Sequence, residues 1–174
     1  AVLAALTGIL IYIAMRFEWR LSLGAVGALA HDVILTLGLF SILGLEFDLT
    51  VLAAVLAVIG YSINDSVVIS DRIRESFRKF HRGTPEEIIN EALTSTLSRT
   101  VVTSLTTILV LIALYVLGGQ LIRGFATALL FGVVVGSYSS VFIGSSLALV
   151  LGVSREDLMP PEVEKEGEDL EPMP

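Results

Sequence analysis

The sequence contains no cysteine among its 174 residues, which excludes disulfide bonds and catalysis by a thiol. Charged residues make up only 17% of it, whereas soluble domains usually carry about a quarter. Motifs of soluble catalysis are missing as well. There is no glycine-rich loop for phosphates and no group of metal ligands, and the serines have no base at a suitable spacing. The sequence therefore predicts neither an enzyme nor a bound cofactor or metal.

Hydrophobic residues, in contrast, make up 54% of the chain, and the mean hydropathy is +0.83. The net charge of -7 does not describe a binding surface, because eight of the acidic residues follow Gly152. Nucleic acid is therefore not an expected partner. We interpret the chain as an all-α integral membrane protein, a polytopic helix bundle in contact with lipid.

Apolar runs predict five membrane-spanning helices, since a crossing helix needs about 20 residues. The runs cover residues 1–15, 21–45, 49–70, 100–122 and 124–154. The first run is short and does not begin with methionine, so we interpret it as the remainder of a helix in a fragment of a longer chain, not as a signal peptide. Residues 1–153 are assigned to the membrane bundle, and residues 154–174 to an acidic, disordered tail.

Residues 71–96, between the third and fourth runs, predict an amphipathic helical hairpin near the membrane surface. Gly83 is expected to end its first helix. Thr84, Pro85 and Glu87 are expected to begin the second helix through a capping box, with the proline at the first helical position.

The basic residues are distributed unevenly between the predicted loops. Residues 16–20, the hairpin and the tail hold nine of the eleven Lys and Arg residues. The positive-inside rule therefore places these segments in the cytoplasm and residue 1 on the opposite side.

Asp65 is the most unusual residue of the third run, since residues 49–70 contain no other ionisable side chain, tyrosine aside. A charge at the centre of a membrane helix costs about 2.5–3.5 kcal/mol, so Asp65 needs a partner or a function. Arg99 is the expected partner, because both residues lie about 9–10 Å along their helices from the same membrane surface. Asn64 and Thr103 add polar groups next to Asp65 and Arg99.

Two interpretations of this predicted pair remain open. A carboxylate paired with Arg stays ionised, and the same group freed into an apolar setting binds a proton, so proton uptake could break the pair and move a helix. Alternatively, the pair only holds two helices together. Intramembrane ionisable residues are usually functional, which favours the transport interpretation.

His31 and Asp32 form a secondary candidate site in the middle of the second run. Adjacent helical residues point about 100° apart, so the two side chains cannot both face one groove well. This favours an interior histidine and a structural aspartate over a second proton site, and both alternatives stay open.

Small residues at a spacing of four predict close helix packing in the fifth run. The row includes Gly132, Gly136, Ser140 and Gly144. Small side chains let another helix approach closely in lipid, where packing drives association. We interpret the row as a structural contact and not as a substrate path.

Several motifs together resemble the C-terminal membrane part of SecF in the SecD/SecF family, which belongs to the resistance-nodulation-division superfamily. They are GALAHDV at 27–33, GYSINDSVVISDRIRESFRKFHRGTPEEI at 60–88, LSRTVVTSLTT at 97–107, LYVLGG at 114–119, GVVVGSYSSVFI at 132–143, and LGVSRED and VEKEG in the tail. The resemblance covers essentially the whole chain.

The resemblance implies an accessory subunit of the bacterial Sec translocon that works with SecD in the inner membrane. The expected partners are SecD, the SecYEG channel, a YajC-type accessory protein, unfolded preproteins and protons. The family uses the proton-motive force to promote export, and its membrane Asp, Arg and Thr fall on Asp65, Arg99 and Thr103. The chain would correspond to family helices two to six. The alternative function is a purely structural subunit that docks SecD to the channel.

Overall fold

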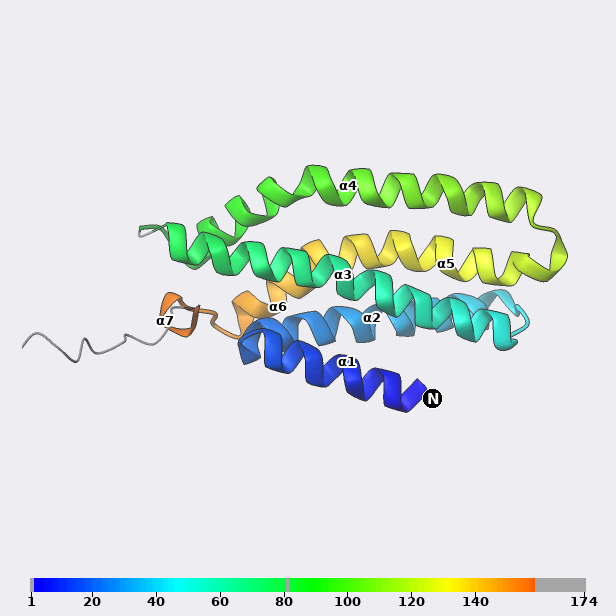
Figure 1. Cartoon of the computed structure of the whole chain (residues 1–174), viewed down its shortest axis with the longest axis horizontal. Coiled ribbons are helices and arrows are strands. Elements are labelled where there is room, and N and C mark those ends of the chain that lie inside the picture. The colour runs from blue at the N-terminus through cyan, green and yellow to red at the C-terminus, as the bar shows by residue number, and fades with distance from the viewer. Residues whose placement is uncertain (1, 81, 159–174) are drawn as a thin grey trace, which may run out of the picture.

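The computed structural model describes residues 2–80 and 82–158, and every regular element in these ranges is a helix. In chain order the elements are α1 (Val2–Arg16), α2 (Trp19–Leu43), α3 (Leu49–Lys79), α4 (Pro85–Leu117), α5 (Gln120–Ser139), the π-helical turn η1 (Ser140–Gly144), α6 (Ser145–Val150) and α7 (Arg155–Leu158). Figure 1 shows the long helices lying side by side in an elongated bundle. The predicted all-α fold is confirmed.

Four helical stretches in the described residues are long and apolar enough to cross a membrane. They are α2, α3, α4 and the stretch Gln120–Val150, which contains α5, η1 and α6. The apolar part of α1, Thr7–Arg16, is shorter, and Figure 1 shows α1 covering only part of the length of the bundle. The crossing predicted for residues 1–15 therefore stays a prediction.

The segment predicted as a hairpin near the membrane surface comprises the end of α3 and the start of α4, each of which is one continuous helix. Their 31 and 33 residues span about 46 and 50 Å, which exceeds the membrane's hydrocarbon thickness of about 30 Å. The capping box is confirmed: the Thr84 hydroxyl accepts the Glu87 N–H, and the Glu87 carboxylate accepts the Thr84 N–H. α3 ends at Lys79, earlier than predicted, and Gly83 lies in the turn with a φ of +122°.

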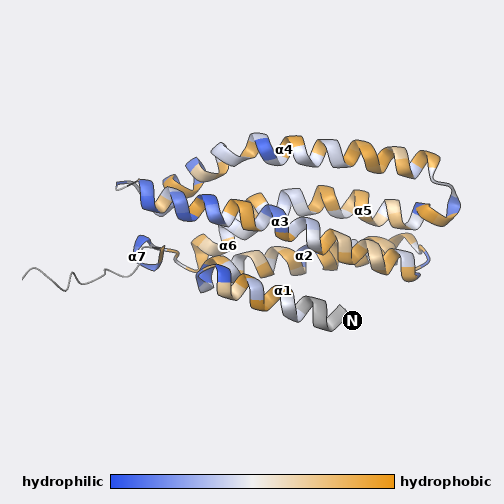
Figure 2. Ribbon diagram, in the orientation of Figure 1, coloured by the Kyte–Doolittle hydropathy of each residue, from blue (hydrophilic) through white to orange (hydrophobic). Residues whose placement is uncertain are grey.

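The turn between α1 and α2, the turn between α3 and α4, and α7 lie together at one end of the bundle, which we call the basic end (left in Figure 1). Figure 2 shows hydrophilic residues concentrated on this end of α3 and on α7. Beneath them is an apolar core that includes Phe17, Ile73, Phe77, Ile89 and Leu158, each at most 5% exposed. The core joins α2, α3, α4 and α7.

Residues 155–158, which the sequence assigns to a disordered tail, form the helical turn α7 against α3. Asp157 pairs with the Arg20 guanidinium at the start of α2. Arg78 of α3 donates to the Leu158 carbonyl at 3.1 Å, and the Leu158 side chain is buried. These contacts make α7 part of the folded bundle, while the rest of the predicted tail, residues 159–174, lies outside the described residues.

The first half of the predicted small-residue row packs α5 against α3. A β-carbon added at Gly132 would lie 2.2 Å from Val58 Cγ2, and one added at Gly136 would lie 3.4 Å from Ser62 Cβ. The absence of side chains therefore lets the two helices approach closely in the middle of the bundle.

The second half of the row packs α6 and η1 against α2. A β-carbon added at Gly144 would lie 3.6 Å from the Gly24 carbonyl oxygen and 3.7 Å from Ala28 Cβ. Ser140, the first residue of η1, is buried. The row therefore contacts two helices of the same chain: Gly132 meets α3, Gly136 meets both α3 and α2, and Gly144 meets α2.

Candidate functional site

Asp65 lies at the middle of α3 and is 5% exposed. Its Oδ2 atom is buried and has no hydrogen-bond partner in the described part of the chain. An isolated buried carboxylate is costly, and the usual outcomes are a partner or protonation. The side chain is therefore placed where binding or loss of a proton changes the charge inside the bundle.

Arg99, the predicted partner, is exposed on α4. No ion pair or hydrogen bond joins Asp65 and Arg99 within the described residues. The direct contact expected from the sequence is therefore not formed in this structure.

The rotation of α4 about its axis explains the separation. Its buried positions include Ala92, Thr96, Thr100 and Ser104, a stripe with a spacing of four. Arg99 precedes Thr100 by one position and therefore points about 100° away from this stripe. The equal depth of Asp65 and Arg99 stays a prediction, whereas the expected direction of the arginine side chain differs from that in the structure.

The two polar neighbours expected beside the pair also point elsewhere. The Thr103 hydroxyl donates to the carbonyl groups of Arg99 and Thr100, at 3.0 Å each, and the residue is exposed. Asn64 is exposed on α3. Both are available on the surface of the bundle instead of enclosing Asp65.

Arg99 lines an open groove of about 320 Å³ between α3 and α4. Asp71, Arg72 and Glu75 of α3 line the same groove. The Arg72 guanidinium donates to Ser95 Oγ at 2.8 Å and to Glu75 Oε2 at 2.6 Å. The groove is thus a charged and polar space that begins at Val68, three residues after Asp65, and extends along α3 toward the basic end.

A chain of hydroxyl groups that the sequence did not predict joins α3, α4 and α5 near Asp65. The Tyr61 hydroxyl donates to Ser104 Oγ at 3.0 Å, and Ser104 Oγ lies 2.6 Å from Ser137 Oγ. Tyr61 precedes Asp65 by one turn. The spacing of four from Thr96 to Ser104 in α4 is the sequence signal that could have indicated this buried polar stripe.

The secondary candidates His31 and Asp32 lie in an unbroken α2. Asp32 is 0% exposed. Its Oδ1 atom lies 3.1 Å from His31 Nδ1, and its Oδ2 atom accepts from the Ser62 hydroxyl of α3 at 2.6 Å. Ser62 of α3 therefore belongs to the Asp32 site.

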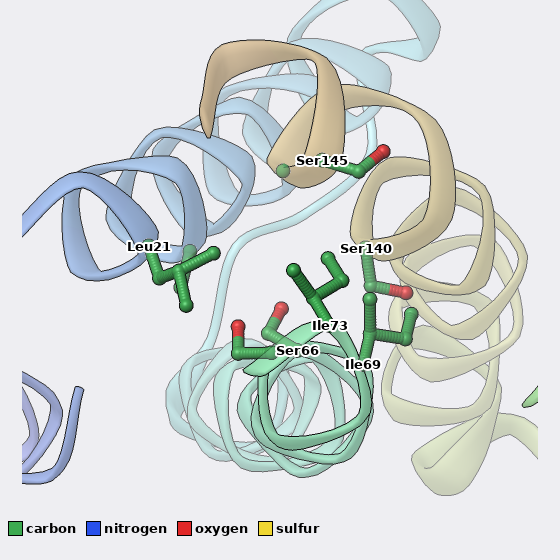
Figure 3. Close-up of a pocket in the computed structure, with 9 residues that line it drawn as sticks. Leu21, Ser66, Ile69, Ile73, Ser140 and Ser145 are labelled. Atoms are coloured by element: carbon green, nitrogen blue, oxygen red, sulfur yellow. The ribbon is translucent and has the colours of Figure 1, made fainter. Parts of the chain in front are cut away.

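A small enclosed cavity lies farther along α3 toward the basic end, between α3, α2 and the π-helical turn (Figure 3). Its lining contains four hydroxyl groups, from Ser66, Ser70, Ser140 and Ser145. Its volume of about 10 Å³ is near the smallest that holds one water molecule. In residues 2–80 and 82–158 no group of three His, Asp or Glu side chains could hold a metal ion.

Over residues 1–154 the sequence matches the family described as protein export membrane protein SecD/SecF, C-terminal. The chain belongs to the SecD/SecF family. This family membership confirms the resemblance seen in the motifs around Asp65 and Arg99.

Relatives within the SecD/SecF family include two proteins named protein translocase subunit SecF. The one from Vibrio alginolyticus is 58% identical over 174 residues, which is all of this chain and 55% of the relative. The one from Escherichia coli O157:H7 is 55% identical over 169 residues, which is 97% of this chain and 52% of the relative. The chain thus spans about half the length of these relatives.

A solved structure with the same fold is a crystal structure of SecDF in a super-membrane-facing form. It superimposes with a TM-score of 0.82 at 46% sequence identity, and the match covers 86% of this chain and 21% of that chain. The helix arrangement around Asp65 is therefore similar to that of a SecDF protein.

Proposed function

We propose that the chain is the membrane part of a SecF-type subunit that works with SecD to promote preprotein export by the proton-motive force. Membership of the SecD/SecF family and similarity to SecF subunits and to a SecDF structure support this proposal. The proposed location is the bacterial inner membrane, with the basic end in the cytoplasm. SecYEG, a YajC-type protein and unfolded preproteins are the further proposed partners.

The observation that carries the proton role is the buried Asp65 carboxyl group, whose Oδ2 atom has no hydrogen-bond partner among the described residues. Arg99 lies on the adjacent helix and acts on it electrostatically without contact. A permanent ion pair would hold α3 to α4 and would resist protonation. The separated arrangement instead leaves the carboxyl group free to bind a proton.

In the proposed mechanism, proton binding at Asp65 removes the attraction between α3 and Arg99. Release of the proton restores it and draws the two helices together across the groove. Thr103 and Asn64 would take part as hydrogen-bonding groups, because both are exposed beside these residues. The acid that completes the path would come from SecD, as the family resemblance implies.

The test measures proton flux and preprotein release in vesicles that contain the intact SecD–SecF complex with Asp65→Asn or Arg99→Met. Both variants should lose flux and release while the yield of complex stays normal. Glu91→Gln and Arg123→Met are the controls, since Glu91 is exposed on α4 outside the groove and Arg123 lies on α5. The controls should retain flux.

The outcomes separate the two candidate functions. A lower yield of complex with unchanged release per assembled complex would favour the purely structural docking subunit. Unchanged flux and unchanged release at normal yield would overturn the proton role of Asp65.

A further inference from the structure

The Asp32 carboxyl group is enclosed by three helices at the centre of the bundle. It projects from α2, Ser62 of α3 donates to its Oδ2 atom, and a β-carbon added at Gly136 of α5 would lie 3.5 Å from that same atom. The residue is 0% exposed. Lipid and solvent therefore have no direct access to the acid.

A permanently ionised Asp32 would need a positive charge close by, and the described residues provide no permanent one. His31 is the ionisable side chain that contacts the carboxyl group in the described residues. Two other helices pack against this position. The charged residue of α3 nearest to Ser62 is Asp65, one turn farther along the helix. The charged residue of α5 is Arg123, which lies more than three turns from Gly136. A buried carboxylate needs a close and well-bonded counter-charge, which only a protonated His31 would supply here.

We propose that His31 and Asp32 form a second proton-binding site, separate from Asp65. The contacts are continuous: the His31 side chain is 33% exposed, its Nδ1 atom contacts Asp32 Oδ1, and Asp32 Oδ2 contacts Ser62. A proton bound at the imidazole can therefore pass to a carboxyl group that is itself sealed. Imidazole and carboxyl groups exchange protons readily over such a distance.

Occupancy of this site changes a contact between α2 and α3. A hydroxyl group that donates to a charged carboxylate makes a stronger bond than one that donates to a neutral carboxyl group. Proton binding at Asp32 therefore weakens the Ser62 link to α2. Ser62 lies one turn from both Asp65 and Ser66, and Ser66 lines the hydroxyl-lined cavity of Figure 3.

The first test is infrared difference spectroscopy of the intact SecD–SecF complex between acidic and neutral pH. Asp32→Asn should remove one carboxyl band from the difference spectrum. Ser62→Ala should shift the frequency of that band without removing it. His31→Gln should shift the pH at which the band reaches half its full intensity. Both of these variants keep the acid, so they test the site even if Asp32→Asn fails to assemble.

Thr36→Val is the matched control. Thr36 is also 0% exposed on α2, but its hydroxyl donates to the backbone carbonyl of Asp32 at 2.7 Å and not to the carboxyl group. This variant should leave the carboxyl band unchanged. A difference spectrum of Asp32→Asn identical to that of the unaltered complex would overturn the proposal, because Asp32 would then keep one protonation state.

The second test separates this site from the proposed role of Asp65. The Asp32 band should persist in the Asp65→Asn complex, whether or not that complex still conducts protons. Disappearance of the band in Asp65→Asn would mean that the titrating group is Asp65 and that the second site does not exist.

A third test measures how preprotein release depends on pH. The pH profile of release should shift in His31→Gln and stay unchanged in Thr36→Val. Equal effects of the two variants would show that the site is only a structural contact.

Discussion

Gly132 of α5 faces Val58 of α3 so closely that a β-carbon on the glycine would lie 2.2 Å from Val58 Cγ2 and 2.7 Å from Cγ1. Val58 is 1% exposed and lies within continuous α3, so it has no free space into which to move. The separation between these two helices is thus set by the missing side chain at residue 132.

Gly132→Ala should destabilise the bundle by about 1–3 kcal/mol, the usual cost of inserting a methyl group into a packed interior. The measurement is the thermal unfolding midpoint of the purified chain in detergent. Val58→Ala should restore part of the loss in the double variant. Gly60→Ala is the matched control, because nothing lies within 4 Å of a β-carbon at that position. An equal loss in both glycine variants would contradict the steric explanation.

Tyr61→Phe should remove one hydrogen bond between α3 and α4 and cost about 0.5–1.5 kcal/mol. The loss should be small because Ser104 keeps its bond to Ser137 on α5. Thermal unfolding in detergent measures it. Tyr138→Phe should be neutral, since Tyr138 is 57% exposed. A Tyr61→Phe chain as stable as the unaltered one would show that the hydroxyl chain does not hold α4 in place.

Thr84→Ala should loosen the first turn of α4, since loss of an N-cap side chain costs about 0.5–2 kcal/mol. Faster hydrogen exchange at the first amides of α4 would report the change, with Glu87 as the most affected residue because its N–H loses its acceptor. Thr94→Ala is a suitable control, because the Thr94 hydroxyl only donates to the Asn90 carbonyl within the same helix. If both variants exchange alike, the cap contributes nothing measurable.

The contact of α7 with the bundle should weaken at acidic pH. The Ser154 hydroxyl is the main cause that holds the pKa of Asp157 below its ordinary value, with smaller contributions from the Ser154 N–H and the Arg20 charge. A carboxyl group whose pKa is lowered by folding stabilises the fold above its unfolded pKa of about 3.9. That contribution is lost as the pH falls through the lower, folded value.

Hydrogen exchange of residues 152–158 at neutral and strongly acidic pH measures this effect. Asp157→Asn should give fast exchange already at neutral pH, and acidification should then add little. Glu156→Gln is the control, since Glu156 is exposed next to Asp157. If hydrogen exchange in the unaltered chain does not depend on pH, the Asp157 contacts do not hold α7 against the bundle.

The sequence predicted those features of the fold that depend on local chemistry. The capping box at Thr84 and Glu87 was correct, because capping depends on residues three positions apart. The four long apolar helices followed from hydropathy alone.

The candidate site was harder to predict, because its geometry depends on helix rotation. Counting residues gave similar depths for Asp65 and Arg99, but depth does not determine the direction of a side chain. That direction is set by tertiary packing, here by the buried stripe through Thr100 and Ser104. The contact of the Ser62 hydroxyl with Asp32 on α2 depends on helix rotation in the same way.

The π-helical turn Ser140–Gly144 has a consequence for how this chain can vary in length. A π turn accommodates one residue more than a regular α-helix and so re-aims every side chain that follows it. Gly132 precedes it and meets Val58 of α3, whereas Gly144, its last residue, meets Gly24 and Ala28 of α2. A single-residue deletion here would rotate α6 about its axis and turn Ala148, which is 1% exposed, away from Gly24 of α2.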